Sequence, residues 1–134
     1  MSQENVEVVK AAYEAFASER LDRWIEHFTD DVEWRPVEGG PDDFGPIHGK
    51  DALRAWLQDW IETFDEFWME PLELIDAGED KVVAVERYGG RARLSGVETD
   101  QTEAEVFTVR NGKIARGHEY ATRDEALEAA GLRE

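Results

Sequence analysis

The chain has 134 residues, with 32 acidic and 15 basic side chains and a formal net charge of −17. This length fits one domain, residues 1–134, that buries a single core. The negative charge repels the phosphates of nucleic acids and anionic membranes, so neither is expected as a partner. The absence of cysteine excludes disulfides, thiolate metal ligands and a cysteine nucleophile.

The sequence shows no targeting or membrane signal. Its first residues, MSQENVEVV, carry neither the basic nor the apolar region of a secretory signal. No apolar run in the sequence approaches the roughly 18 residues that span a membrane. These features predict a cytoplasmic protein.

The first half of the chain predicts three amphipathic helices. Apolar side chains recur there at steps of three and four residues, which places them on one stripe of each helix. The pattern predicts helices over residues 3–17, 19–28 and 50–64. Between the second and third helices, residues 32–35 alternate as in a short strand, and the Pro- and Gly-rich residues 36–49 predict a loop.

The second half predicts strands and one last helix. Turn-forming residues such as Gly89-Gly90 and Asn111-Gly112 separate its apolar segments. Thr122, followed by Glu125, predicts a helix N-terminus, and Gly131 is placed to end that helix. The expected strands cover residues 67–75, 81–88, 91–98, 103–110 and 113–121.

Helices followed by an antiparallel meander predict an α+β fold. The expected form is a cone in which a strongly curved, mostly antiparallel sheet wraps around three helices. The outer face of that sheet would mix apolar residues with arginines, so we expect a homodimer through it. The residues assigned to this outer face are Val106, Thr108, Arg110, Ile114, Arg116 and Tyr120.

Four segments resemble one superfamily in the order in which they occur. They are AAYEAF at 11–16, HFTDDVEW at 27–34, GPIHGKDALRAW at 45–56 and VFTVRNGKIARGHEY at 106–120. With them the chain resembles the nuclear transport factor 2-like superfamily, in its SnoaL-like branch, which is related to polyketide cyclases and ketosteroid isomerase. The resemblance implies a cystatin-like α+β roll with a small-molecule pocket, and no cofactor. It is not specific for function, because this scaffold carries both enzymes and binding proteins.

The turn at Asn111-Gly112 decides which side chains enter the pocket. A two-residue loop would pair Arg110 with Lys113 and place Glu105 opposite His118. A three-residue loop with a bulge at Gly112 would shift the register by one and place Glu105 opposite Glu119. Small residues after the turn suit a crowded concave face, and the family pattern agrees, so the three-residue loop is preferred.

Glu105 and Glu119 are thus the candidate acid–base pair. Burial and mutual repulsion both favour the protonated form, so one can act as an acid and the other as a base. The alternative is that an arginine such as Arg87 or Arg91 neutralises them. The resemblance assigns Tyr13 to a position whose phenol stabilises an enolate, against the plain interpretation of Tyr13 as a core residue.

The resemblance to ketosteroid isomerase would place that enzyme's general base just after Trp34, where this chain has Arg35 and Pro36 instead, which argues against a steroid isomerase. The expected pocket walls are Trp34, Trp56, Trp60 and Phe107, although core packing explains them equally well. The three histidines lack metal-binding spacing, so no metal is expected. Two functions remain open. One is a cofactor-independent isomerase, cyclase or hydrolase acting on a small apolar carbonyl or epoxide compound, and the other is a non-catalytic small-ligand binder.

Overall fold

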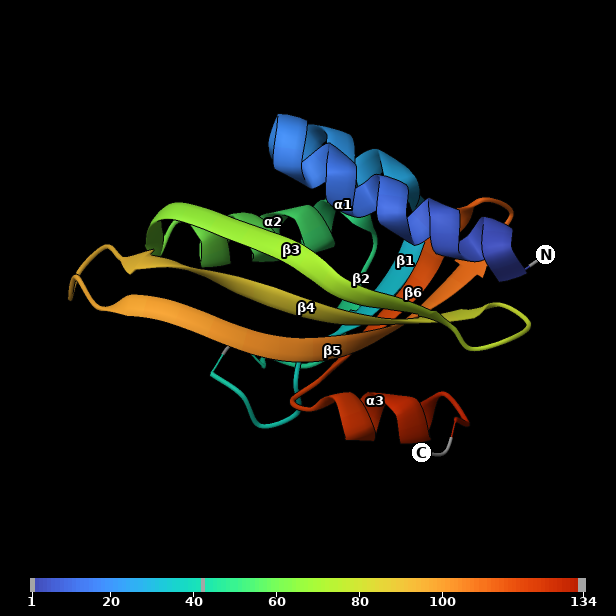
Figure 1. The fold of residues 1–134 in the computed structure, drawn as a ribbon. Coiled ribbons are helices and arrows are strands. Elements are labelled where there is room, and N and C mark those ends of the chain that lie inside the picture. Colours follow the sequence, from blue (N-terminus) through green and yellow to red (C-terminus); the bar gives the residue numbers. More distant parts are fainter. Residues whose placement is uncertain (1, 42, 133–134) are drawn as a thin grey trace.

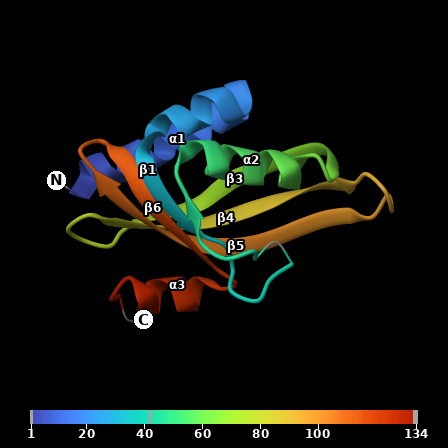
Figure 2. The same ribbon diagram turned by 180° about the vertical axis from the view of Figure 1, so that it is seen from behind.

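A computed structural model describes residues 2–41 and 43–132 of the chain. Figure 1 shows a curved sheet with two helices on its concave side and a short helix on the opposite side, and Figure 2 shows the same layers from behind. The elements in chain order are α1 (Ser2–Trp24), the 3-10 turn η1 (Ile25–His27), β1 (Phe28–Arg35), β2 (Ile47–His48), α2 (Lys50–Ile61), β3 (Phe64–Asp76), β4 (Lys81–Ala92), β5 (Glu98–Arg110), β6 (Lys113–Tyr120) and α3 (Arg123–Ala129).

The sheet has six strands in the order β2-β1-β6-β5-β4-β3. Only the β1–β6 pair is parallel among these described strands, and the other neighbours run antiparallel. The predicted α+β class with a curved, mostly antiparallel sheet is confirmed. The main core lies between the concave face of this sheet and the helices α1 and α2.

The two helices predicted over residues 3–17 and 19–28 are one helix, α1, which ends at Trp24. The prediction was wrong because no glycine or proline interrupts residues 17–21, and the residues present there are compatible with a helix. Phe16 and Leu21, on either side of the expected break, are both buried in the core. The concave face therefore holds two helices, α1 and α2, rather than three.

Gly89-Gly90 does not form a turn, because β4 continues through both residues to Ala92. The turn lies at residues 93–97, and β5 begins at Glu98, so the expected separate strand over 91–98 does not exist. A Cβ on Gly89 would lie only 2.0 Å from the carbonyl oxygen of Thr99. The glycine is therefore needed for close approach of the neighbouring strand, and not for a reversal of the chain.

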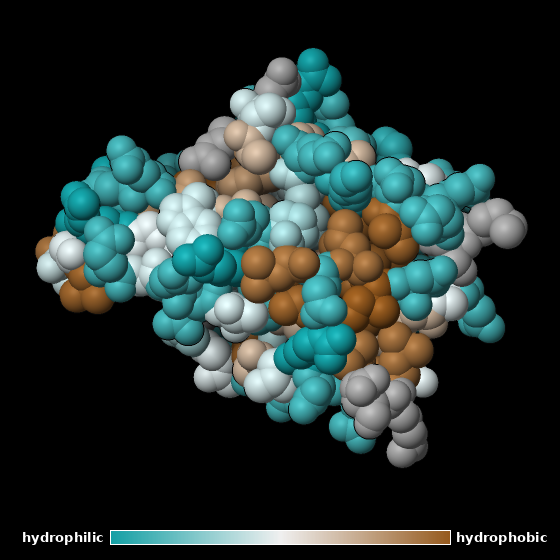
Figure 3. Space-filling model, in the orientation of Figure 1, coloured by the Kyte–Doolittle hydropathy of each residue, from teal (hydrophilic) through white to brown (hydrophobic). Residues whose placement is uncertain are grey.

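The final helix forms as predicted, with the Thr122 hydroxyl accepting a hydrogen bond from the Glu125 backbone N–H at 3.2 Å. Ala126 and Leu127 of α3 pack on Val106 and form a second apolar cluster on the outer side of the sheet. Tyr120 packs against that cluster. Apolar residues also gather in the middle of this side, where β3, β4 and β5 lie beside α3 (Figure 3).

The outer face differs from the predicted one at Ile114. This side chain is fully buried in the main core on the concave side, because a bulge in β6 changes the alternation there. Val106 is on the outer side but is covered by the chain's own α3. Among the described helices, none is long and apolar enough to cross a membrane.

Candidate functional site

A cavity of about 50 Å³ lies between α1, α2 and the concave face of the sheet. The predicted wall residues Trp34, Trp56, Trp60 and Phe107 all line it. The lining combines these rings with other apolar side chains and with four glutamates, and no described lining residue is basic. The glutamates are Glu86 on β4, Glu103 and Glu105 on β5, and Glu119 on β6.

Tyr13 reaches this cavity from α1 and is buried. Its hydroxyl oxygen lies 2.7 Å from Oε1 of Glu86 and 3.1 Å from Oε1 of Glu105. A phenol has one hydrogen to donate, so it cannot serve both carboxylates at once. When one glutamate is protonated, it donates to the phenol oxygen while the phenol donates to the other glutamate. The geometry therefore favours a shared proton in this triad.

Glu86 is the member of this triad that sequence reasoning missed. It lies in the β4 segment of residues 82–86, which is buried throughout. Burial is the main cause that raises the pKa of Glu86 to about 7. The sequence did contain a sign of its importance, because Glu86 ends an otherwise apolar strand segment. A buried carboxylate in such a segment needs either a partner or a proton.

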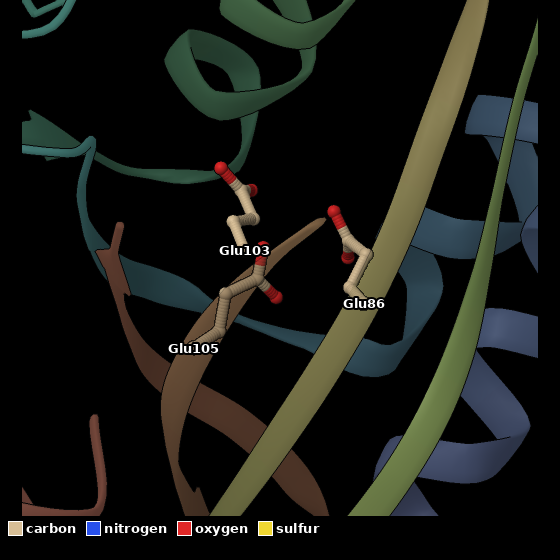
Figure 4. Close-up of side chains that lie close together, drawn as sticks. All are labelled: Glu86, Glu103 and Glu105. Carbon is tan, nitrogen blue, oxygen red and sulfur yellow. The ribbon is translucent and has the colours of Figure 1, made fainter. Parts of the chain in front are cut away.

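Glu105 has a pKa well above its usual value, first because of burial and then because of the charges of Glu86, Glu103 and Glu119. Figure 4 shows that Glu86 approaches Glu105 and Glu103 from the adjacent strand. The same burial and the adjacent carboxylates raise the pKa of Tyr13 well above that of a free phenol. Burial in this cavity thus favours the protonated forms of Tyr13, Glu86 and Glu105.

Glu119 enters the cavity from β6 and accepts a hydrogen bond from the indole Nε1–H of Trp34 at 2.9 Å. Both side chains are buried. Gly117 makes this contact possible, because a Cβ on residue 117 would lie 2.3 Å from the Trp34 ring. The glycine lets the indole lie against β6, and the indole then fixes the Glu119 carboxylate.

The turn between β5 and β6 has two residues, so the preferred three-residue loop is wrong. Arg110 pairs with Lys113, and Asn111 and Gly112 have φ angles of 53° and 80°, as a type I′ turn requires. The register then shifts between Thr108 and Val109. Two consecutive residues, Ile114 and Ala115, are buried at this bulge.

Because of this bulge, Glu105 has the same partner on β6 that the three-residue loop would have given it. Glu105 lies opposite Glu119, and Val106 lies opposite His118. His118 is therefore on the outer face, where its Nδ1 is 3.0 Å from the Tyr120 hydroxyl. Burial, followed by the charges of Arg35 and Arg116, lowers its pKa. The alternative acid–base pair of Glu105 with His118 does not form.

The arginines proposed as neutralising partners lie elsewhere. Arg87 binds Asp100 through two hydrogen bonds of 2.8 and 2.6 Å and also contacts Glu70. Arg91 binds Glu98 at 3.2 Å. Neither of these arginines lines the cavity, so the interpretation that they neutralise the buried glutamates is wrong.

Glu86, Glu103 and Glu105 are also the residues that could hold a metal ion, since one oxygen from each lies within 4.8 Å of the others. Carboxylate oxygens suit hard cations such as Mg²⁺ or Ca²⁺. A metal would first have to displace the proton that burial favours on Glu86 and Glu105. The prediction that no metal binds rested on the spacing of the histidines. It did not take into account that Glu86 on β4 lies close to Glu103 and Glu105 on β5.

Comparisons with known proteins identify the family. The SnoaL-like domain family matches residues 9–117. A search of curated protein sequences finds no match.

Solved structures share the fold at low sequence identity. Bal32a, from a soil-derived mobile gene cassette, has 22% identity and a TM-score of 0.79, with 96% of each chain covered. TerC, co-crystallised with polyporic acid, has 22% identity and a TM-score of 0.75, covering 96% of this chain and 98% of its own. A protein with a ketosteroid isomerase-like fold from Catenulispora acidiphila, in complex with trimethylamine, has 16% identity and a TM-score of 0.73, covering 95% and 94%.

The structural matches support the same fold, whereas the family match rests on the sequence itself and spans most of the chain. The predicted resemblance is therefore confirmed, and this protein belongs to the SnoaL-like domain family.

Proposed function

We propose that this SnoaL-like domain is a cofactor-independent acid–base enzyme that moves a proton on a small, largely apolar carbonyl compound. The observation that carries the proposal is the Tyr13 hydroxyl, held 2.7 Å from Glu86 and 3.1 Å from Glu105 in a cavity with apolar walls. In an isomerisation this proton moves to another carbon, and in an aldol-type cyclisation its removal gives the enolate carbon that then forms the new bond to a second carbonyl carbon, whose oxygen takes up the proton. Hydrolysis of an epoxide would use the same acid, with the proton going to the ring oxygen as its bond to carbon breaks and a water molecule, losing a proton to the base, adds to that carbon.

The acidic side of the site is the triad of Tyr13, Glu86 and Glu105. A substrate carbonyl oxygen placed at the triad receives a hydrogen bond from Tyr13 or from the protonated carboxyl of Glu105. These donors stabilise the negative charge that develops on the oxygen when an adjacent carbon loses a proton. A neutral carboxyl as a donor to an enolate is an established use of a raised carboxyl pKa.

Glu119 is the base in this proposal. The Trp34 N–H donates to its carboxylate and holds it at the cavity wall, where it can accept a proton from a substrate. Directly opposed residues of an antiparallel pair have Cβ atoms roughly 5 Å apart, so Glu119 faces the same small volume as Glu105. Glu119 takes the proton from the carbon next to the carbonyl, the electron pair moves to oxygen, and the proton returns to a carbon of the product.

The experiment is exchange of the α-hydrogens of cyclohexanone in D₂O, followed by proton NMR. We expect the protein to accelerate exchange above the buffer rate, and Glu119→Gln to remove the acceleration, because an amide keeps the size but cannot take the proton. Glu128→Gln, an exposed charge change on α3, is the matched control and should exchange like the unmodified protein.

The alternative is a non-catalytic ligand-binding protein on the same scaffold. It predicts that ketones bind and shift the melting temperature while exchange stays at the buffer rate. It also predicts equal ligand affinity for Glu119→Gln and the unmodified protein. Two structural neighbours carry small ligands, polyporic acid in TerC and trimethylamine in the Catenulispora acidiphila protein, which supports a small-molecule partner in either case.

We also propose that the protein forms a homodimer through the outer sheet face that α3 leaves open. The partly buried apolar residues around the α3 cluster, Ile75, Ala77, Tyr120, Ala130 and Leu132, support this surface, and apolar residues gather on this side of the molecule (Figure 3). Light scattering at micromolar concentration should give twice the monomer mass of 15.3 kDa. A single species of the monomer mass would contradict the dimer and would leave the proposed chemistry untouched.

A further inference from the structure

A hydrogen-bond donor and an acceptor lie next to each other in the cavity. The donor is the Tyr13 hydroxyl, and the acceptor is Oε1 of Glu86, 2.7 Å away. Oε1 of Glu105, at 3.1 Å from the same hydroxyl, is a second acceptor. All three side chains are buried and line the cavity. A phenol has one hydrogen to donate, and in this arrangement it serves a carboxylate of the protein itself.

A plain ketone would disturb this arrangement. In the proposed function the substrate carbonyl takes the hydrogen bond of Tyr13, and Glu86, which is only 5% exposed, then loses that hydrogen. The carboxyl oxygens of Glu103 and Glu105 lie with those of Glu86, so the group has more acceptor oxygens than hydrogens. No described lining residue is Lys, Arg or His, and a buried acceptor without a donor is costly. A well-matched substrate therefore brings a donor of its own.

The distance between the two protein oxygens indicates where in the substrate this donor lies. The Tyr13 hydroxyl and Oε1 of Glu86 are one hydrogen-bond length apart. When each binds one substrate oxygen, those two oxygens are similarly close together, as are a carbonyl and a hydroxyl on neighbouring carbon atoms. A carboxylic acid offers the same pair, but it ionises near neutral pH, and the lining has four glutamates and no described basic residue.

We propose that the substrate of this site is an uncharged α-hydroxy ketone, whose carbonyl oxygen accepts from Tyr13 while its hydroxyl donates to Glu86. This inference deepens the proposed function and rests on it for the role of Glu119 as the base. The hydroxyl replaces at Glu86 the hydrogen that Tyr13 gives to the carbonyl, so no buried oxygen loses a partner. The apolar walls of the cavity suit short hydrocarbon groups on the two oxygen-bearing carbons.

The reaction that fits this substrate moves the carbonyl group to the neighbouring carbon. Glu119 removes the hydrogen of the hydroxyl-bearing carbon as a proton, and the electron pair left behind forms a double bond to the carbonyl carbon. The carbonyl electron pair moves to its oxygen, which takes the proton of Tyr13.

The enediol formed in this way completes the reaction. It gives its original hydroxyl proton to Glu86, and that oxygen forms the new carbonyl as the former carbonyl carbon takes the proton back from Glu119. Because the pKa of Glu86 is about 7, its ionised form is present near neutral pH to accept this proton. Glu86 then returns the proton to Tyr13 across 2.7 Å. No oxidant or reductant is consumed, since the hydroxyl and the carbonyl have only exchanged places.

The experiment uses acetoin, 3-hydroxybutan-2-one, labelled with ¹³C at its carbonyl carbon and followed by carbon NMR. Transfer of the carbonyl gives acetoin again, with the label now on the hydroxyl-bearing carbon. We expect the full chain to move the label faster than buffer does. Glu86→Gln should lower this rate by about 10²-fold, because an amide cannot take the hydroxyl proton. Glu128→Gln, an exposed change on α3, should move the label like the unmodified protein.

A second ketone tests recognition of the hydroxyl. In 3-methylbutan-2-one a methyl group replaces the hydroxyl of acetoin, and exchange of the hydrogen on its branched carbon is measured in D₂O. Each rate is divided by the buffer rate of the same ketone. We expect the relative acceleration to be at least about tenfold larger for acetoin, the factor that one hydrogen bond to a charged group provides. Glu86→Gln should reduce this preference.

A label that stays on the carbonyl carbon at the buffer rate would overturn the inference. Equal relative acceleration of the two ketones would also overturn it, because the hydroxyl would then not be recognised. A loss in Glu128→Gln as large as that in Glu86→Gln would contradict the assignment of the acceptor to Glu86. In each case accelerated exchange of cyclohexanone leaves the acid–base function standing. If cyclohexanone and both of these ketones react at their buffer rates, the two proposals fail together.

Discussion

Glu86 and Arg87 are neighbours on β4 but lie on opposite faces of the sheet, and their surroundings differ completely. Glu86 faces the cavity, where the Tyr13 hydroxyl lies 2.7 Å from its carboxylate, and burial raises its pKa to about 7. Arg87 faces outward, binds Asp100 and Glu70, and lies 5.1 Å from the centre of the Trp68 ring. The hydrogen bonds from Arg87 lower the pKa of Asp100.

The contrast shows how a chain with a net charge of −17 can use the same residue type in two ways. Outside, acidic side chains are solvated or paired with arginines, and they stay charged. Inside, the lining provides no described basic partner, so burial favours the protonated forms of Glu86 and Glu105. The concave face is therefore the proton-holding side, and the predictions below test that difference between the two faces.

The largest expected effect is that of Tyr13→Phe on proton transfer. The variant removes the donor between Glu86 and Glu105, and loss of one such donor lowers turnover by about 10²-fold to 10³-fold. The rate of cyclohexanone exchange measures it, with circular dichroism to verify the fold. Tyr120→Phe, which removes an outer-face phenol bound to His118, is the matched control. A comparable loss in the control would contradict the assignment of the reaction to the concave face.

The next effect is the pH dependence of stability in Glu86→Gln. The folded protein holds the Glu86 proton up to pH about 7, while the unfolded chain releases it near 4.5. The stabilising contribution of the protonated group is thus complete below pH 4.5 and is lost as pH rises through 7. Glutamine does not titrate, so the variant should gain about 2 to 3 kcal/mol relative to the unmodified protein between pH 5 and pH 8.

Urea unfolding followed by tryptophan fluorescence at the two pH values measures this gain. Because the strongly negative chain repels itself more at high pH, the comparison is always between variant and unmodified protein at the same pH. Glu128→Gln, at an exposed position of α3, is measured in parallel, so that the effect of losing one negative charge can be subtracted from the result for Glu86→Gln. A difference between Glu86→Gln and the unmodified protein that stays constant with pH would show that Glu86 titrates normally.

A smaller effect is expected for Gly117→Ala. The added Cβ would lie 2.3 Å from the Trp34 ring, and overpacking of this kind costs roughly 1 to 3 kcal/mol. The displaced indole should also lose its hydrogen bond to Glu119, so exchange activity should fall while the protein remains folded. Ala115→Gly, on the same strand, tests whether any change of a small β6 residue has the same result. Unchanged activity in Gly117→Ala would mean that Trp34 does not position Glu119.

The β5–β6 hairpin shows what the sequence alone could establish. Alternation and the Asn-Gly turn predicted both strands, and the small residues of β6 indicated that its concave side was crowded. The loop type was wrong, because one extra residue can enter at the turn or at a bulge a few residues later, and both give the same register at Glu105. The Asn-Gly pair favours the two-residue type I′ loop, but the bulge that then shifts the register depends on the packing of Ile114 into the core, which local sequence does not show.

Glu86 was missed for a related physical reason. Its importance depends on Tyr13, which is 73 residues away in the sequence, and on the absence of an arginine among the described residues that line the cavity. A single sequence shows an acidic residue in an apolar strand, but it does not show which strand face carries the arginines. The continuation of β4 through Gly89 was likewise decided by a long-range contact, the close approach of Thr99 on the neighbouring strand.

The smallest expected effect is that of Arg87→Gln, on the other face of β4. Its contacts with Asp100 and Glu70 are solvent-exposed, and exposed ion pairs contribute about 0 to 1 kcal/mol. Unfolding free energy in urea should therefore change by less than about 1 kcal/mol, and the change should shrink at high salt because screening weakens exposed pairs. The rate of cyclohexanone exchange should not change at all. If Arg87→Gln altered the exchange rate as strongly as Tyr13→Phe, the charge of Arg87 would be acting on the buried glutamates from the other face of the sheet. The conclusion that the two faces act independently would then be wrong.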